Sequence, residues 1–520
     1  MTTTPGTTVR SLLPGTGSDA ALVTVEGDVL DHTSLAQEVD RLAGQLAAAG
    51  IGPNDRVAVV LPNGPEMALT LLAVMSAGCA APLNPKYTED EFAFYLGDLH
   101  PAALVTVEGG APAATSVAGD TPVLHVVGSG LQLDFAVGAA AERQGAGRRQ
   151  PPGDRQPPGD RQPAGDDQAL VLHTSGTTSR PKIVPLRQRH LAASARNIAA
   201  ALGLGAGDRS LNVMPLFHIH GIMAGMLAPL SAGGAVVATP GFDAFSFGRW
   251  LNDLRPTYYS AVPTMHHLVL ARTRPAQPVS LRFVRSSSSS LPRPVLDQLR
   301  STFGVPVIEA YGMTEATHQM TTNPLPPGEA KPGSVGLPAG IEVGIVDKAK
   351  AFLPPRQPGE VVIRGATVVD GYENNPGANE DAFFDGWFRT GDEGFLDEDG
   401  YLFLTGRIKE QINRGGEKIS PLEVEEVLLG HAAVAEAAVF AIPDERLGED
   451  VGAIVVPAEG KAPTEAELRK HVRERLTAFK VPRTILVASE IPKGATGKVQ
   501  RIGLAEKLGL AGGQARPATQ

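Results

Sequence analysis

Residues 170–186 read LVLHTSGTTSRPKIVPL, and this stretch decides how the rest of the chain is interpreted. An apolar run typical of a buried strand leads into a loop of hydroxyl-bearing residues and glycine, and Lys182 follows the loop. Backbone N–H groups in such a loop form a nest for an anion and the lysine supplies positive charge, so the segment predicts a polyphosphate site. The spacing is not G-x-x-x-x-G-K-[ST], so the P-loop fold is not indicated. From residue types alone, an ordinary surface turn remains the alternative.

The N-terminal part of the chain alternates between helix and strand patterns. Ser34 with Gln37 and Thr88 with Glu91 have the spacing of capping boxes, which predicts that helices begin there. Helices are expected at 34–50, at 65–78 and from 88, and strands at 57–61, 80–83 and 103–107. This alternation predicts parallel strands covered by helices on both faces, with ligands bound at the carboxyl ends of the strands.

A second unit begins near residue 408, where the pattern changes. Thr464 and Glu467 have the spacing of another capping box. Helices are expected at 421–429 and 464–476, and strands at 435–442, 451–456 and 484–488. We therefore predict a large α/β domain at 17–408 and a small α+β domain at 409–510.

Three segments are expected to lie outside these two packed units. Residues 149–166 read RQPPGD, RQPPGD and RQPAGD, and their proline and glycine deny them helix or ladder hydrogen bonds. This composition predicts a flexible surface insert at 145–166 within the large domain. Residues 1–16 and 511–520 are expected to be loose tails.

Composition excludes several classes of protein. The 520 residues are 42% hydrophobic and 20% charged, as in globular domains. The net charge of −10, with scattered basic residues, argues against nucleic-acid and membrane partners. Cys79 is the only cysteine, which rules out an internal disulfide, predicts a core position and fits the cytoplasm. The apolar run at 67–83 is broken by polar residues and falls short of the roughly 20 residues that span a bilayer, so it predicts a buried helix.

Four motifs in a fixed order resemble those of the adenylate-forming superfamily, which includes acyl-CoA synthetases, luciferases and the adenylation domains of peptide synthetases. They are TSGTTSRPK at 174–182, YGMTE at 311–315, the TGD and GR elements around Asp392 and Arg407, and PKGATGK at 492–498. The resemblance covers nearly the whole chain apart from the insert and the tails. It implies an α/β fold: a large N-terminal domain of doubly wound parallel sheets plus a distorted β-barrel subdomain, followed by a small mobile α+β C-terminal domain.

The resemblance also implies the reaction. A carboxylate attacks the α-phosphate of ATP to give an acyl-adenylate and pyrophosphate, and the thiol of coenzyme A then displaces AMP. The residues expected to bind ATP or AMP are Thr174, Ser175, Gly176, Thr177, Thr178, Lys182, Ser288, Glu309, Ala310, Tyr311, Gly312, Thr314, Asp392, Arg407 and Lys498.

Individual roles follow from the same resemblance. Thr314 would contact the α-phosphate, and Glu315 would bind Mg²⁺, which prefers carboxylate and phosphate oxygens. Tyr311 would stack on adenine, while Asp392 would accept hydrogen bonds from the ribose hydroxyls, with Arg407 nearby. Taken alone, each has a plainer interpretation: a core aromatic, a turn aspartate or a charge on a helix face.

A mobile small domain needs a hinge and a path for coenzyme A. Lys498 would bridge the incoming carboxylate and the α-phosphate, and it cannot serve the thiol step while it occupies that position. Relatives rotate the small domain about a residue just after the GR element, where Lys409 stands. Gly415 and Gly416, followed by Lys418, would approach the pantetheine arm; a plain hairpin turn is the alternative.

The residues expected to hold the acid are polar. PLFHIHG at 215–221, TEATH at 314–318 and the serine run 286–290 supply hydrogen-bond donors that suit a second carboxylate better than an alkyl chain. The expected acid-binding residues are His218, His220, Ser288, Ser289 and His318, and the expected catalytic residues are Lys498, Thr314, Glu315 and His218. These stretches resemble the oxalate–CoA ligases of plants and fungi, which implies oxalate as the substrate.

Three departures from the family pattern leave alternatives open. Ile183 stands where relatives usually carry glycine, Gly312 replaces a common alanine, and the run 286–290 is all serine. The competing hypotheses are a CoA ligase for malonate, a fatty acid or an aryl acid, and a weakly catalytic nucleotide-binding protein. The expected cofactors and partners are ATP, Mg²⁺, coenzyme A and a small carboxylic acid.

Overall fold

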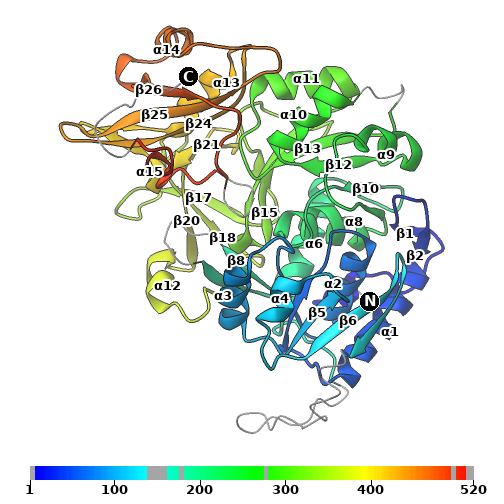
Figure 1. Cartoon of the computed structure of the whole chain (residues 1–520). Helices are drawn as coiled ribbons and strands as arrows, with labels where there is room; N and C mark the ends of the chain where they lie inside the picture. The colour runs from blue at the N-terminus through cyan, green and yellow to red at the C-terminus, as the bar shows by residue number, and fades with distance from the viewer. Residues whose placement is uncertain (1–5, 138–160, 175–180, 274–278, 494–498, 511–520) are drawn as a thin grey trace.

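The computed structural model describes residues 6–137, 161–174, 181–273, 279–493 and 499–510. Figure 1 shows how the chain is layered. Two large sheets with their helices form the blue-to-green part, an antiparallel sheet lies beside them in yellow-green, and the last part of the chain, in orange and red, lies at the top.

The first large sheet has seven strands in the order β7-β6-β5-β3-β4-β8-β9. Its central pairs are parallel, and the edge pairs β6–β7 and β8–β9 are antiparallel. The bounds are β3 Arg56–Val60, β4 Cys79–Pro82, β5 Ala103–Val107, β6 Val123–Ser129, β7 Gln132–Val137, β8 Gln168–Thr174 and β9 Lys182–Arg187. The strands predicted at 57–61, 80–83 and 103–107 are therefore present, shifted by at most one residue at an end.

The second large sheet has nine strands in the order β16-β15-β14-β13-β12-β10-β11-β1-β2. Its centre, from β1 through β14, is parallel, which confirms the predicted doubly wound arrangement. The bounds are β1 Ala20–Val23, β2 Val29–Asp31, β10 Arg209–Asn212, β11 Ala235–Ala238, β12 Tyr258–Ala261, β13 Phe283–Ser287, β14 Val307–Met313, β15 His318–Thr322 and β16 Leu337–Pro338.

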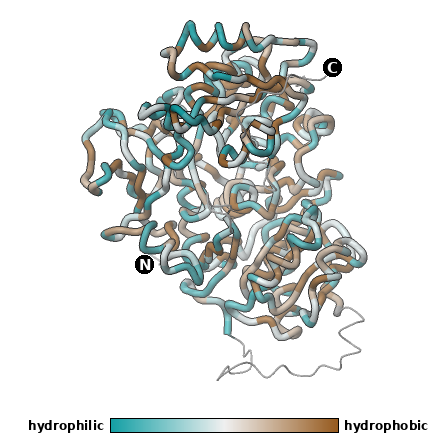
Figure 2. The backbone as a smooth tube through the Cα atoms, turned by 60° about the vertical axis from the view of Figure 1, so that its left-hand side comes forward, coloured by the Kyte–Doolittle hydropathy of each residue, from teal (hydrophilic) through white to brown (hydrophobic). Residues whose placement is uncertain are grey.

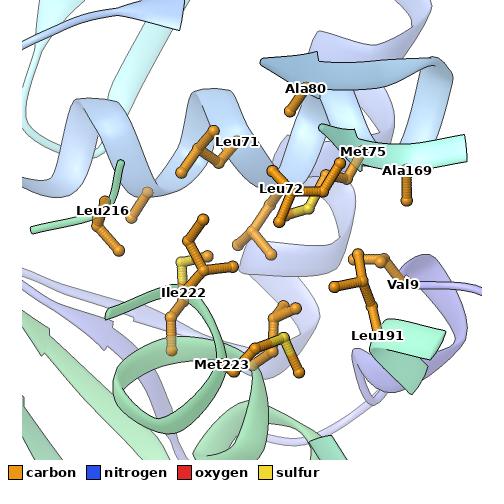
Figure 3. Close-up of a cluster of buried hydrophobic side chains, with 14 of the residues drawn as sticks. Val9, Leu71, Leu72, Met75, Ala80, Ala169, Leu191, Leu216, Ile222 and Met223 are labelled. Atoms are coloured by element: carbon orange, nitrogen blue, oxygen red, sulfur yellow. The ribbon is translucent and has the colours of Figure 1, made fainter. Parts of the chain in front are cut away.

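Helices cover and separate these sheets. Helix α2 (Pro65–Ala77) is apolar all round, and every residue from Met67 onward is buried, as predicted for this run. Figure 3 shows Leu71, Leu72 and Met75 of α2 facing Ile222 and Met223. The other helices are α1 His32–Ala48, α3 Glu89–Leu99, α4 Pro112–Ser116, α6 Gln188–Ala201, α7 Ile219–Ile222, α8 Ala228–Ser231, α9 Phe247–Leu254, α10 Pro263–Arg272 and α11 Arg293–Phe303.

The first residues of helices α1 and α3 test the two capping boxes predicted for the N-terminal part of the chain. Thr88 and Glu91 form the expected reciprocal box at the start of α3. The Ser34 prediction was wrong: α1 begins at His32, and the Ser34 N–H donates to the Asp31 side chain at 2.6 Å. Asp31 ends strand β2 and is an equally good N-cap residue, so the N-cap lies three residues earlier than expected.

The N-terminal segment 6–16 is not a loose tail. Val9, Leu12 and Leu13 are buried in the main core, and Figure 3 shows Val9 beside Leu191 of α6. The Val9 N–H also donates to Gln188 Oε1 at 2.8 Å. Three apolar side chains in a short turn bury enough area to hold this segment on the sheet layer.

The insert prediction falls mostly on residues outside the described ranges. Residues 161–166 are described, and they are attached: Arg161 pairs with Asp167 at 2.6 Å, and Asp166 pairs with Arg189 at 2.8 Å. Ion pairs therefore attach the final hexamer to Asp167, which immediately precedes β8, and to Arg189 of helix α6.

The third sheet is antiparallel and curled, as expected for the barrel subdomain. Its strands are β17 Glu342–Val346, β18 Gly359–Arg364, β19 Phe383–Phe384, β20 Trp387–Leu396 and β21 Leu402–Arg407, with helix α12 at Pro376–Ala382. β20 pairs with both β18 and β21, and Asp392 lies opposite Arg407 in the second pairing.

The fourth sheet has its own hydrophobic core, which includes Ile412, Val424 and Val439. Its elements are β22 Ile412–Arg414, β23 Glu417–Ile419, α13 Pro421–Leu429, β24 Val434–Asp444, β25 Gly448–Pro457, α14 Glu465–Arg473, β26 Thr484–Val487 and α15 Leu504–Lys507. The Thr464–Glu467 capping box is present. Figure 2 shows α14 at the top as a largely hydrophilic helix, and its residues Leu468 and Val472 are buried.

Two further expectations concern cysteine and membrane. Cys79 is fully buried, and burial raises the pKa of its thiol to about 12, as suits a core residue. Within the described ranges, the helices are all too short or too polar to cross a bilayer.

Candidate active site

The phosphate-loop prediction lies between strands β8 and β9. Thr174 ends β8 and pairs across the antiparallel ladder with Lys182, the first residue of β9. Ser175, Gly176, Thr177 and Thr178 lie outside the described residues. The pairing of β8 with β9 holds Thr174 and Lys182 opposite each other, so Lys182 lies next to the strand end from which the predicted loop begins.

Lys182 belongs to a cluster that includes an aromatic residue not predicted from the sequence. Its Nζ lies 4.3 Å from the centre of the Tyr372 ring, and the Tyr372 hydroxyl donates to Glu315 Oε1 at 2.9 Å. Burial lowers the pKa of Lys182, and the Glu315 carboxylate opposes that shift. Tyr372 therefore connects Lys182, which is predicted to bind phosphate, to Glu315, the predicted magnesium ligand.

Glu315 fits the role of a single protein ligand for Mg²⁺. No group of three or more His, Cys, Asp or Glu side chains suited to a metal occurs in the described part of the chain. Mg²⁺ that is bound chiefly through substrate phosphates needs only one or two carboxylates. Glu315 is 6% exposed and follows β14 in the short turn Thr314–Ala316, close to Lys182.

Asp392 lies at the centre of a second cluster. Its carboxylate pairs with Arg407 Nε at 3.0 Å and accepts a hydrogen bond from the Tyr311 hydroxyl. Burial raises the pKa of Asp392, and the Arg407 guanidinium opposes this rise. The structure thus joins the predicted ribose, adenine and GR residues, which come from β14, β20 and β21.

The strand that carries Tyr311 also carries Glu309 and Ala310. Glu309 is buried, its Oε1 accepts the Leu291 N–H at 3.4 Å, and burial raises its pKa to about 7. The Ala310 carbonyl accepts from Ser287 Oγ at 3.0 Å. The two contacts tie the middle of β14 to Ser287 of the serine run and to Leu291, which follows the run.

The absence of a side chain at Gly312 has a steric reason. A Cβ at Gly312 would lie 1.9 Å from the His318 carbonyl oxygen, at a bulge in the β14–β15 pairing.

We expect Gly312→Ala to lower the melting temperature and raise KM for the acid, because the backbone at His318 must move and overpacking of this kind costs about 1–3 kcal/mol. Thermal melting and steady-state kinetics test this. Gly97→Ala on α3 is the control, since a Cβ there has open space and should not destabilise. An unchanged Gly312→Ala enzyme would contradict the prediction.

Ile183 does not lie in the loop. It is the second residue of β9, pairs with His173 and is buried with Val171 in a satellite core. Its side chain therefore packs a strand.

The predicted acid residues divide into two groups. His220 and His318 are each 3% exposed, and their rings stack with centroids 4.9 Å apart. His220 Nδ1 lies 3.2 Å from Ser288 Oγ, so three predicted residues from α7, the serine run and β15 meet. Ser289 is exposed and donates to the Ser288 carbonyl, and half-buried His218 lies against Phe217.

An arginine that the sequence analysis missed lies behind this group. Arg285 of β13 is fully buried and donates to Ser260 Oγ and to Gln319 Oε1, both at 2.9 Å. It also lies 3.5 Å from His220 Nε2 and 3.4 Å from His318 Nε2. The one available signal was a charged residue inside the apolar strand pattern that precedes the serines.

The predicted hinge residue lies close to the cluster of Lys182, Tyr372 and Glu315. Lys409 is exposed in the turn Ile408–Glu410, and its charge contributes to the lowered pKa of Lys182. Arg501 donates to Glu410 at 2.9 Å and to Glu425 at 2.9 Å, which ties the C-terminal segment to this turn.

The remaining predictions concern the small domain. Gly415 and Gly416 form the turn of the β22–β23 hairpin with φ of 62° and 97°, and Lys418 is exposed on β23. Lys498 lies outside the described residues. An antiparallel bridge between Lys493 and Val499 brackets the segment that contains it.

The fold and these clusters are those of an acid-activating enzyme that uses a nucleoside triphosphate. The profile of the AMP-binding enzyme family matches residues 14–373, and that of the AMP-binding enzyme C-terminal domain matches residues 423–498. The chain belongs to this family and is an AMP-forming acid–CoA ligase.

Individual relatives agree with this assignment. The chain is 44% identical over 491 residues to an oxalate–CoA ligase of Arabidopsis thaliana, covering 91% of this chain and 92% of that protein. It is 39% identical over 469 residues to an oxalate–CoA ligase of Saccharomyces cerevisiae, covering 87% and 86%. O-succinylbenzoate coenzyme A synthetase of Bacillus subtilis, in complex with ATP and a magnesium ion, superposes with a TM-score of 0.80 at 30% identity, covering 95% of this chain and 98% of that chain.

Proposed function

We propose that this ligase joins oxalate to coenzyme A. A carboxylate oxygen of oxalate forms a bond to the α-phosphorus of ATP while the bond to pyrophosphate breaks. The sulfur of coenzyme A then bonds to the acyl carbon, the bond to AMP breaks, and the thiol proton is released. Oxalate, ATP and coenzyme A thus yield oxalyl-CoA, AMP and pyrophosphate.

The nucleotide half of the site supports the first step. Lys182 and the loop 174–178 would hold the β- and γ-phosphates, and Asp392 with Tyr311 and Arg407 would hold the ribose end. Glu315 would bind Mg²⁺, which neutralises phosphate charge when bound. Lys498 would offset the repulsion between the two anions as they approach.

The acid half supports oxalate, and one observation carries that choice. Buried His220 and His318 and half-buried Ser288 form a group of hydrogen-bond donors and acceptors where a fatty acid would require an apolar tunnel. Leaving these polar groups unpaired against an alkyl chain would cost binding free energy. The names of the two relatives at 44% and 39% identity agree with this choice.

A change of domain orientation would separate the two half-reactions. We propose rotation about Lys409, which removes Lys498 from the acyl-phosphate and brings the Gly415–Gly416 turn toward coenzyme A. Since both glycines have positive φ, larger residues there would strain the turn.

Pyrophosphate release from ATP by the purified protein tests the substrate. We expect oxalate with coenzyme A to give the highest kcat/KM in a panel that also contains malonate, acetate, octanoate and a cinnamate. Each acid is tested with and without coenzyme A. A higher value for octanoate or cinnamate would overturn the oxalate proposal and leave the ligase class intact.

A further inference from the structure

Arg285 carries a positive charge that no carboxylate in the described part of the chain balances. It is 0% exposed at the centre of strand β13. Its two terminal nitrogens donate to neutral groups, Ser260 Oγ and Gln319 Oε1, and its Nε has no partner among the described residues. Burial lowers its pKa to about 10, which leaves the guanidinium charged at neutral pH.

A buried charge of this kind is costly unless something compensates it. Asp208 pairs with the neighbouring exposed Arg282 at 2.7 Å and not with Arg285. The groups around Arg285 also include His220 and His318, and both of these belong to the proposed acid site. The missing counter-charge therefore has a natural source in an anionic substrate.

The hydrogen bonds that begin at Arg285 are donated in one direction, from the guanidinium toward the proposed acid site. A guanidinium only donates, so Ser260 Oγ accepts from Arg285 and its own hydrogen points to His220 Nε2, 2.6 Å away. A hydrogen on Nε2 would face the guanidinium at 3.5 Å, so His220 carries its hydrogen on Nδ1 and donates it to Ser288 Oγ. Ser288 accepts this bond, and its own hydroxyl hydrogen is then directed to an acceptor.

His318 is oriented in the same way. Arg285 lies 3.4 Å from His318 Nε2, so this nitrogen is the acceptor and Nδ1 carries the hydrogen. Gln319 accepts from Arg285 through Oε1, and its Nε2, a donor, has no partner in the described ranges. The Gln319 amide is thus oriented in the same way, with its acceptor on Arg285 and its donor away from the guanidinium.

We propose that Arg285 is a positioning residue that makes this site select acids with a second anionic group. It acts through Ser260, His220 and Ser288, which it turns into donors, and through its own charge. The inference rests on the proposed function and deepens it, because a second carboxylate both accepts these hydrogen bonds and balances the charge. A neutral group of the same shape, such as an amide, fits the site but does not balance the charge of Arg285.

The test compares each dicarboxylate with its half-amide: oxalate with oxamate, and malonate with malonamate. We expect the wild-type protein to favour the dicarboxylate, and Arg285→Gln to lower that preference by about 10-fold or more by raising KM for the dicarboxylate, given the usual cost of losing a charged partner. KM for ATP should stay within about threefold, since Arg285 does not belong to the nucleotide clusters. Arg285→Lys should restore part of the preference because it keeps the charge.

Two further variants separate specificity from folding. Ser260→Ala keeps the charge of Arg285 and interrupts the chain to His220, so it should lower the same preference by a smaller factor. It also decides the question if Arg285→Gln does not fold. Arg293→Gln, at an exposed arginine that pairs with Asp297, is the matched control and should change nothing.

The outcomes distinguish this inference from the oxalate proposal. A higher kcat/KM for malonate than for oxalate, with a preference for malonate over malonamate that depends on Arg285, would support the inference and overturn oxalate. An oxalate preference that is equal in wild type, Arg285→Gln and Ser260→Ala would overturn the inference alone. A wild-type protein that prefers the half-amides or plain monocarboxylates would overturn both.

Discussion

Lys498→Ala is expected to abolish acyl-adenylate formation almost completely. The lysine is proposed to neutralise the carboxylate and the α-phosphate as they approach, and removing one such group costs about 100- to 1,000-fold in rate. The fall should appear in kcat for ATP–pyrophosphate exchange with oxalate, with a smaller change in KM for ATP. Hydrolysis or thiol transfer from a supplied acyl-adenylate should be much less affected, because that step is proposed to follow the departure of Lys498.

Lys493→Ala is the matched control for this variant. Lys493 precedes the segment that contains Lys498 and forms the bridge to Val499, and its ammonium pairs with Glu436 at 2.8 Å. This half-exposed pair should contribute little to stability or rate. An exchange rate that falls equally in both variants would show that the segment acts through its fold, and would contradict a specific role for Lys498.

Glu315→Gln has the second largest expected effect. The substitution keeps the shape and the hydrogen bond from Tyr372, and removes the one negative charge proposed to bind Mg²⁺. We expect kcat/KM for ATP to fall by about 100-fold, with a higher Mg²⁺ concentration needed for half-maximal rate. Titration of the pyrophosphate-release rate with Mg²⁺ measures both quantities.

Tyr372→Phe separates the charge from its support. It removes the hydroxyl that orients Glu315 but keeps the ring beneath Lys182, and we expect a decrease of about tenfold, in the range of groups that orient metal ligands. A Glu315→Gln enzyme with normal Mg²⁺ dependence would refute the proposed metal role, whatever Tyr372→Phe does.

The errors of the sequence analysis share a cause. Tyr372 and Arg285 were missed because neither belongs to a motif, and their partners are distant in the sequence: Tyr372 bonds Glu315, and Arg285 bonds Ser260. The tail prediction failed because three apolar residues in a Thr/Gly/Pro-rich segment find a core built by other segments. Local patterns do not contain such contacts.

Predictions that depended on local physics fared better. The Thr88–Glu91 and Thr464–Glu467 boxes join residues three apart, so spacing alone defines them. The Ser34 prediction failed at the same scale because Asp31 offers a competing cap. The strand before the phosphate loop was predictable because an apolar run followed by a Gly/Ser/Thr turn is typical of a buried strand that ends there.

The sequence by itself determined the class of this protein, the parallel architecture and the order of the nucleotide motifs, because each depends on short stretches of chain. Only the tertiary structure decided which polar residues share the proposed acid site. Parallel pairing places Ser260 of β12 directly opposite Arg285 of β13, and α7 brings His220 against both. Strand register across a sheet depends on packing of the whole core, so it selects Ser288 over Ser289 and adds an arginine that no motif contained.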